Sequence, residues 1–281
     1  MINYYKTVFN IKNTAEFNKS AIDLFNFQMK NNSLYNYYAK SILKKSTPKN
    51  IYEIPFLPIS FFKTNQIICN NLSVDKIFYS SGTTGEKSKH LISDISIYVK
   101  SFTTCFKQFY GNIQDYCILA LLPSYKEQTN SSLIYMIDTL IKKSKHPKSG
   151  YYLSDYSNLS NTIQSLEKNK EKTILFGVTY ALLDFAEQYP QKLKHTVIIE
   201  TGGMKGKRKE IIKNEVHRKL KKSFSVKNIH SEYGMTELLS QAYSKNDNIF
   251  TTPKWMKILI RDIHDPLSII KENKIGCINI I

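Results

Sequence analysis

From Lys76 onward, short apolar segments alternate with longer amphipathic ones, and this alternation limits the possible folds more than any other feature. The short segments are KIFYS, YCILALL, KTILFGV and HTVIIET, each bounded by polar or turn-forming residues. The longer segments are SDISIYVKSFTTCFKQFY, TNSSLIYMIDTLIKK, SNLSNTIQSLEKN and TYALLDFAEQY, in which apolar residues recur at helical spacing. Strands that alternate with helices pair in parallel through crossovers, so the predicted class is α/β with mainly parallel sheets. Because the strands are apolar almost throughout, we expect helices on both faces of the sheet.

The rest of the chain adds an N-terminal helical region and three further candidate strands. TAEFNKSAIDLFNFQMK and SLYNYYAKSILKK have helical patterns, and the Pro-containing segment IPFLPISFF (54–62) is expected to be extended. The candidate strands are SVKNIH, KILIRD and CINII. No internal repeat, low-complexity tract or Gly/Ser linker divides the sequence. We therefore expect one domain over residues 1–281, with a helical cap at 1–65 and an α/β core at 66–281.

The composition is that of a globular protein, with 281 residues of which 42% are hydrophobic. No apolar run approaches the ~20 residues that a membrane helix needs, so membrane insertion is not expected. The N-terminal segment MINYYKTVFNIK lacks the apolar core and cleavage site of a secretory signal, which favours a cytoplasmic location. Cys69, Cys105, Cys117 and Cys277 lie far apart without a CxxC pair. We expect them to be reduced thiols, in neither a zinc site nor a disulfide framework.

The net charge of +17 raises the possibility of nucleic-acid binding. Arginine, the usual residue for bidentate phosphate and base recognition, is rare, however, and occurs only at Arg208, Arg218 and Arg261. The densest basic stretch is 205–222, and its apolar residues are Ile211, Ile212, Val216 and Leu220. Their spacing predicts an amphipathic helix with a solvated basic face, so we do not expect a nucleic-acid partner.

The sequence FYSSGTTGEKSKH, from Phe78 to His90, follows the first candidate strand and could hold a polyphosphate. Ligands bind beyond the carboxyl ends of strands in such sheets, and we expect this loop to open there toward a helix. Glycines let the backbone approach an anion, while hydroxyls and lysines add donors and charge. The alternative is an ordinary Ser/Thr/Gly turn. The Walker pattern is excluded because only two residues separate Gly82 from Gly85, and no GxGxxG pattern occurs.

Two more segments follow at the ends of candidate strands, ETGGMKG (200–206) and SEYGMTE (231–237). In this order the three motifs resemble those of the adenylate-forming superfamily, which includes acyl-CoA synthetases, luciferases and peptide-synthetase adenylation domains. The segment IPFLPISFFK and the residues of the two later motifs are similar to the corresponding sequences of the acyl-protein synthetase branch. That branch contains the long-chain-fatty-acid–luciferin-component ligases of bacterial bioluminescence and related acyltransferase-like proteins. The resemblance implies the fold of the large N-terminal domain of these enzymes.

The resemblance also implies ATP and Mg²⁺ as cofactors and a role for each matched residue. The β- and γ-phosphates would be held by Ser80, Ser81, Gly82, Thr83, Thr84 and Gly85. Thr236 would bind the α-phosphate, and Glu237 would bind Mg²⁺ with help from Thr84, which makes these three the catalytic residues. The adenine would stack on Tyr233, within the motif that also contains Gly234 and Met235, and would have Gly202, Gly203 and Met204 along its other side.

Each of these residues also has a plain structural interpretation. Taken alone, Tyr233 would be a half-buried packing residue and Glu237 a solvated carboxylate. His230 could face an acyl group, or it could be a histidine with a structural role. The apolar segment 177–186 could line an acyl tunnel, but its spacing is that of a core helix, and we predict core.

The sequence departs from the superfamily pattern in two places. The superfamily loop continues as x-Pro-Lys, whereas here Glu86 and Ser88 flank Lys87, so Lys87 or Lys89 would have to substitute. The final KIGCINII resembles the strand before the ribose-binding Asp. We expect that Asp, the small C-terminal domain and its adenylation lysine to be absent, as in a truncated reading frame. Cys277 lies inside this predicted strand, so the acyl-accepting role of a near-terminal cysteine is not assigned to it.

Three functions are therefore compared. The first is an ATP-dependent ligase that converts a carboxylic acid, of the fatty-acid class, to an acyl-adenylate. It would then transfer the acyl group to a protein thiol or another acceptor, such as a reductase or an acyl carrier protein. The second is a truncated or catalytically silent relative that binds nucleotide or acyl groups within a complex. The third, a basic nucleic-acid-binding module, predicts steeply salt-dependent binding to DNA or RNA.

Overall fold

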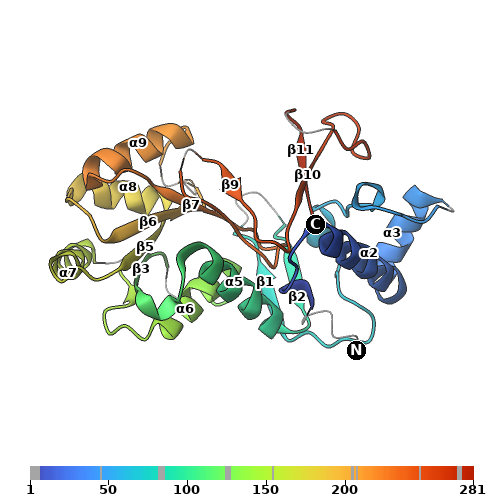
Figure 1. Ribbon diagram of the computed structural model, residues 1–281, viewed down its shortest axis with the longest axis horizontal. Coiled ribbons are helices and arrows are strands. Elements are labelled where there is room, and N and C mark those ends of the chain that lie inside the picture. Colours follow the sequence, from blue (N-terminus) through green and yellow to red (C-terminus); the bar gives the residue numbers. More distant parts are fainter. Residues whose placement is uncertain are drawn as a thin grey trace. The chain divides into compact units, whose positions relative to one another are not determined.

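The computed structural model describes residues 7–44, 46–81, 86–123, 128–153, 155–203, 206, 208–246, 248–270 and 274–281 (Figure 1). Contacts divide the chain into two compact units. Unit 1 comprises Met1–Tyr79, Glu86–Tyr98 and Thr252–Ile281, and unit 2 comprises Ser80–Gly85 and Val99–Thr251. The C-terminal residues thus group with the N-terminal helices in unit 1. The division into a helical cap at 1–65 and an α/β core at 66–281 stays a prediction.

Unit 2 contains a seven-stranded sheet in the order β4-β3-β5-β6-β7-β8-β9. Its strands are β3 (Cys117–Leu121), β4 (Gly150–Tyr151), β5 (Thr173–Val178), β6 (Thr196–Thr201), β7 (His230–Tyr233), β8 (Ala242–Ser244) and β9 (Phe250–Thr251). The pairs from β4 to β7 are parallel, and β8 and β9 continue the sheet antiparallel. The predicted α/β class with a mainly parallel sheet is therefore confirmed.

Helices cover both faces of this sheet. They are α5 (Ile95–Tyr110), α6 (Ser132–Ser144), α7 (Tyr156–Lys168), α8 (Thr179–Gln188) and α9 (Lys213–Phe224), and η2 (Ile113–Asp115) precedes β3. Figure 1 shows α8 and α9 on one side of the sheet and α5 and α6 on the other. Every residue of β3 and β5 is buried, which explains their uninterrupted apolar sequence. The segment 177–186 is core as predicted, since most residues of α8 are buried.

The basic helix begins later than its sequence pattern predicted. Ile212 is the extended residue before α9 and is 73% exposed, whereas Val216 and Leu220 are buried on the helix as expected. Just upstream, Arg208 contacts α8: its Nε lies 2.8 Å from Asp184 Oδ1, and its Nη1 donates to Glu187 Oε1 at 3.0 Å. These ion pairs join the segment before α9 to α8.

Unit 1 combines helices with two antiparallel strand pairs. Its elements are α2 (Thr14–Asn31), α3 (Ser33–Leu43), η1 (Ile51–Glu53), α4 (Phe61–Thr64), β1 (Lys76–Tyr79), β2 (Lys89–Ile92), β10 (Ile258–Arg261) and β11 (Cys277–Ile280). Asn13 and Asn32 cap α2 and α3 by accepting hydrogen bonds from backbone N–H groups. Phe17 and Phe25 of α2 belong to the same buried cluster as Leu259 of β10, so the two ends of the chain share one core.

Two sequence predictions need correction in unit 1, those for KIFYS and for the end of segment 54–62. KIFYS forms β1, but β1 pairs antiparallel with β2 and does not join the parallel sheet, so the Ser80 loop connects a hairpin and does not lead into a helix. KILIRD and CINII form strands as predicted, β10 and β11, and these pair antiparallel with each other. The segment 54–62 is non-helical up to its end, where α4 begins. Among the described helices, none is long and apolar enough to cross a membrane.

Candidate functional site

Two of the three motif segments leave the main sheet at the same edge. β6 ends at Thr201 and continues into Gly202 and Gly203, while β7 ends at Tyr233 and continues toward Glu237. The two strands are parallel neighbours, with Glu200 opposite Ser231. Carboxyl ends of parallel strands meet at one edge, which is where ligands bind in open α/β sheets.

The glycines after β6 allow a sharp exit from the sheet. Gly202 has φ +75°, a left-handed conformation that favours glycine. A Cβ placed at Gly203 would meet no atom within 4 Å, which leaves open space beside the backbone. Met204 lies outside the described residues, so its predicted adenine contact stays a prediction.

The segment after β7 forms a turn that holds the predicted metal ligand beside the predicted stacking ring. The Leu238 N–H donates to the Met235 carbonyl at 3.1 Å, and Thr236 and Glu237 within this turn are half-buried. Burial raises the pKa of Tyr233, and the Glu237 carboxylate raises it further.

The Ser80 loop is only partly described. Ser80 is half-buried and Ser81 is exposed, whereas Gly82, Thr83, Thr84 and Gly85 lie outside the described residues. Lys87 and Lys89, the two candidates for the loop lysine, are both exposed. The predicted roles of this loop on phosphate and metal therefore stay predictions. Among the described residues, no group of three His, Cys, Asp or Glu side chains is placed to hold a metal ion.

A buried carboxylate that the sequence analysis missed holds the end of β6. The Glu200 carboxylate accepts hydrogen bonds from Thr179 Oγ1 at 2.7 Å and Ser231 Oγ at 3.1 Å. Lys213 Nζ lies 3.3 Å from Glu200 Oε2, and His217 Nε2 lies 4.0 Å from it. We call these five residues the Glu200 network. They come from β6, α8, β7 and α9, so the network ties together the elements that surround the motif edge.

The Glu200 network keeps its carboxylate ionised. Burial alone would raise the pKa of Glu200, but the hydrogen bonds from His217 and Thr179 and the charge of Lys213 outweigh it and lower the pKa. Thr179 Oγ1 also lies 3.5 Å from the Gly202 carbonyl, so the same hydroxyl contacts the strand end and the glycine turn.

A second missed carboxylate, Glu232, lies on the opposite face of the sheet. Its Oε2 accepts a hydrogen bond from Thr201 Oγ1 at 2.5 Å, and its side chain is buried. A Cβ at Gly234 would lie 2.5 Å from Glu232 Oε1, so a side chain at that motif glycine would displace the carboxyl group. Gly234 is thus explained by close packing within the motif.

Glu232 should make stability depend on pH near neutrality. Burial raises its pKa to about 7, with the Thr201 hydrogen bond opposing and the Glu200 charge adding to the shift. An unfolded glutamate releases its proton at about pH 4.3. The folded state therefore retains a proton that the unfolded state has lost, and the free energy of unfolding should fall as pH rises through this window. Urea unfolding at about pH 5 and pH 8 should show this fall in the wild type and a smaller one in Glu232→Gln. Equal falls would show that Glu232 is ionised in the folded protein.

His230 has a structural role. It is the first residue of β7 and lies at the end of the strand away from the motif edge. Its Nδ1 is 3.2 Å from Tyr110 Oη, and the two rings stack with centroids 5.8 Å apart. Burial, assisted by the Lys245 charge, lowers the pKa of His230 to about 4, so the ring is neutral at pH 7. Of the two sequence interpretations, the structural histidine is the one that fits.

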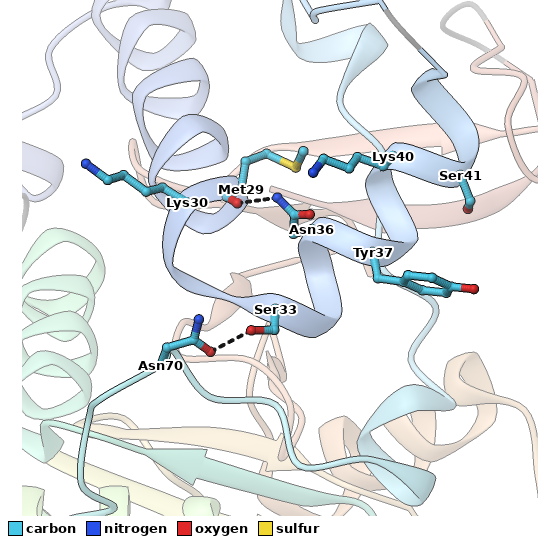
Figure 2. A pocket seen from close by; sticks show the side chains of 8 residues that line it. All are labelled: Met29, Lys30, Ser33, Asn36, Tyr37, Lys40, Ser41 and Asn70. Carbon is cyan, nitrogen blue, oxygen red and sulfur yellow. Dashed lines mark hydrogen bonds between the residues drawn. The ribbon is translucent and has the colours of Figure 1, made fainter.

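A groove of about 690 Å³ lies in unit 1, along α3 and the end of α2 (Figure 2). It is lined by Met29, Lys30, Ser33, Asn36, Tyr37, Lys40, Ser41 and Asn70. Asn36 Nδ2 donates to the Met29 carbonyl at 2.5 Å and Ser33 Oγ donates to Asn70 Oδ1 at 2.9 Å. The predicted nucleotide-binding residues that the structure describes, such as Ser80, Gly203 and Tyr233, are not among its lining residues.

The sequence matches no protein-family model and no curated protein. Among solved structures, the chain is similar to an o-succinylbenzoate coenzyme A synthetase (MenE) from Bacillus subtilis in complex with AMP, with 16% identity and a TM-score of 0.46 over 75% of this chain. The same enzyme with ATP and magnesium ion matches 76% of this chain with 16% identity and a TM-score of 0.45. The anthranilate CoA ligase AuaEII in complex with anthranoyl-AMP matches 75% with 14% identity and a TM-score of 0.45. This chain spans 42%, 43% and 39% of these three structures, respectively.

Proposed function

We propose that this chain belongs to an acyl-adenylate-forming ligase, which uses ATP to activate a carboxylic acid and then transfers the acyl group. The observation that carries the proposal is the common exit of the ETGG and YGMTE segments from neighbouring parallel strands, with Glu200 and Ser231 in register. Two motifs separated along the chain are thereby placed side by side at the edge where such sheets bind ligands.

The described residues suit the parts of ATP that the motifs would bind. The Tyr233 ring is half-buried and is of a type that stacks on adenine, and the backbone at Gly203, after the neighbouring strand, has open space beside it. Glu237 offers a hard oxygen ligand, and Mg²⁺ binds through one or two carboxylates while keeping several waters. Bound there, Mg²⁺ would neutralise phosphate charge during adenylation. Thr236, in the same turn, would donate its hydroxyl to the α-phosphate.

In this proposal the protein works mainly by positioning and by charge stabilisation. A carboxylate oxygen attacks the α-phosphorus of ATP, a P–O bond forms, and the bond to pyrophosphate breaks. The attack brings two negatively charged groups together, so fixed donors and cations are the main requirement. Because the sequences of its motifs resemble those of the acyl-protein synthetase branch, we propose that the substrate is a fatty acid and that the acyl group passes to a protein thiol.

Carboxylate-dependent exchange of labelled pyrophosphate into ATP tests this proposal. When supplied with the ribose-binding Asp and the adenylation lysine that the sequence analysis expects to be absent, the protein should catalyse exchange only if Mg²⁺ and a carboxylic acid are both present. A series of straight-chain acids should show which length is preferred. Binding of ATP without exchange for any acid tested would contradict the ligase and favour the catalytically silent nucleotide-binding alternative. Tight binding to DNA that weakens steeply with salt, in the absence of ATP binding, would favour the third function.

A further inference from the structure

One row of paired residues crosses four strands next to the motif edge. Glu200 of β6 is opposite Ser231 of β7, which is opposite Ser244 of β8, which is opposite Phe250 of β9. Paired residues on neighbouring strands point to the same face, so these four side chains share one face of the sheet. The two central members are small, and they leave a space between the long side chains of Glu200 and Phe250.

Lys213, the first residue of α9, occupies this space. Its Nζ lies 3.3 Å from Glu200 Oε2 and 4.8 Å from the centre of the Phe250 ring. The lysine side chain remains 36% exposed, although Glu200 beside it is buried. An ammonium group has three N–H donors, and the carboxylate and the ring face do not use all of them. Lys213 is therefore a partly exposed cation whose position is fixed on two sides.

The Phe250 ring links this cation to the predicted adenine site. Phe250 packs edge-on against Tyr233, with ring centroids 6.1 Å apart and an interplanar angle of 70°. Phe250 is itself 37% exposed. Tyr233, Phe250 and Lys213 thus form a continuous corner of two aromatic rings and an ammonium group, which we call the Lys213 corner.

We propose that Lys213 binds a phosphate group of the nucleotide, with Phe250 and Glu200 holding its ammonium in place. This inference rests on the proposed function, because it assigns the corner to the same ATP. A lysine is a compact point charge that suits a phosphate oxygen. The Glu200 carboxylate also accepts hydrogen bonds from the Thr179 and Ser231 hydroxyls. It therefore stays hydrogen-bonded when the Lys213 ammonium turns toward a ligand.

The competing interpretation is that Lys213 only balances the buried charge of Glu200. The two interpretations predict different effects of a Lys213 substitution on the binding of ATP and of adenosine. A phosphate-binding lysine affects ATP but not adenosine, whereas a purely structural one affects both ligands alike or affects neither.

Binding of ATP and of adenosine, measured by titration calorimetry in the presence of Mg²⁺, separates them. Lys213→Gln should weaken ATP binding by about tenfold or more, the usual effect of losing one charge-assisted hydrogen bond, and should change adenosine binding less than about twofold. Lys213→Arg should recover part of the ATP affinity. The matched control is Lys219→Gln, because Lys219 is on the same helix and pairs with Glu215 at 3.6 Å on the surface. It should change neither affinity.

A second variant guards against misfolding. Lys213→Gln leaves the buried Glu200 carboxylate without its ammonium, so Lys213→Met with Glu200→Gln should also be tested, because it removes both charges together. In that protein the ratio of ATP to adenosine affinity should fall as in Lys213→Gln. ATP binding that is unaffected in folded Lys213 variants, or an equal loss for both ligands, would overturn this inference alone. Failure of the wild type to bind ATP would overturn the proposed function and this inference with it.

Discussion

Replacing Glu237 with glutamine should lower carboxylate-dependent ATP–pyrophosphate exchange by at least about 100-fold, while the protein stays folded. Glutamine keeps the shape of the side chain but loses the charge that Mg²⁺ requires of a ligand in this position. Because Glu237 is only half-buried and lies in a turn after β7, the change should cost little stability. Raising the Mg²⁺ concentration should restore part of the exchange.

The matched control for this experiment is Glu210→Gln, since Glu210 is an exposed carboxylate in the same unit. Its exchange rate should equal that of the wild type. Far-UV circular dichroism and the urea midpoint establish that both variants fold. Exchange at the wild-type rate in Glu237→Gln would remove the metal-binding role of this residue, and the proposed site would then lack its predicted Mg²⁺ ligand.

The main sheet could be predicted from the sequence because its strands carry their own signal. β3 and β5 are buried on both faces, so each is an uninterrupted apolar run between polar residues. The helices between them bury one stripe and expose the other, which produces the 3.6-residue period. Local pattern and tertiary position agree there, and the strand–helix alternation then identifies the parallel class.

The hairpin of β1 and β2 could not be predicted in the same way. The run KIFYS has only three consecutive apolar residues, Ile77, Phe78 and Tyr79, and so short a run does not reveal which partner it will pair with. Pairing depends on KHLI beyond the loop, which begins with two polar residues and gives a weak strand signal. For the same reason the short strands β8 and β9 were not predicted at all.

The two buried carboxylates were missed because their partners are distant in the sequence. HTVIIET and HSEY each contain one glutamate in a strand, and a charge inside an apolar strand is an available signal for a site. The role of each glutamate depends on its partners, however. These are Thr179 and Lys213 for Glu200 and Thr201 for Glu232, and only the fold brings them to these strands. The motifs located the correct edge of the sheet, but they did not indicate what holds that edge together.

Removing the Glu200 side chain should therefore be among the most destabilising single changes at this edge. Glu200→Ala deprives the Thr179 and Ser231 hydroxyls of their acceptor and leaves Lys213 and His217 without the carboxylate. We expect the free energy of unfolding in urea to fall by about 3 kcal/mol, as is usual when one partner of a buried ion pair is deleted. Glu210→Ala, at an exposed carboxylate, should change it by less than about 0.5 kcal/mol.

A double-mutant cycle distinguishes the network from simple loss of packing. If the Glu200 carboxylate and the Lys213 ammonium stabilise each other, Glu200→Ala combined with Lys213→Met should cost less than the sum of the two single changes. Additive losses would show that the pair does not interact in the folded protein. Because Lys213 is held between Glu200 and Phe250, the same cycle measured on ATP affinity reports whether the carboxylate acts on the ligand through the lysine. We expect coupling both in stability and in ATP affinity. This result would show that the buried Glu200 carboxylate joins β6 to α9 and also positions the Lys213 ammonium at the motif edge.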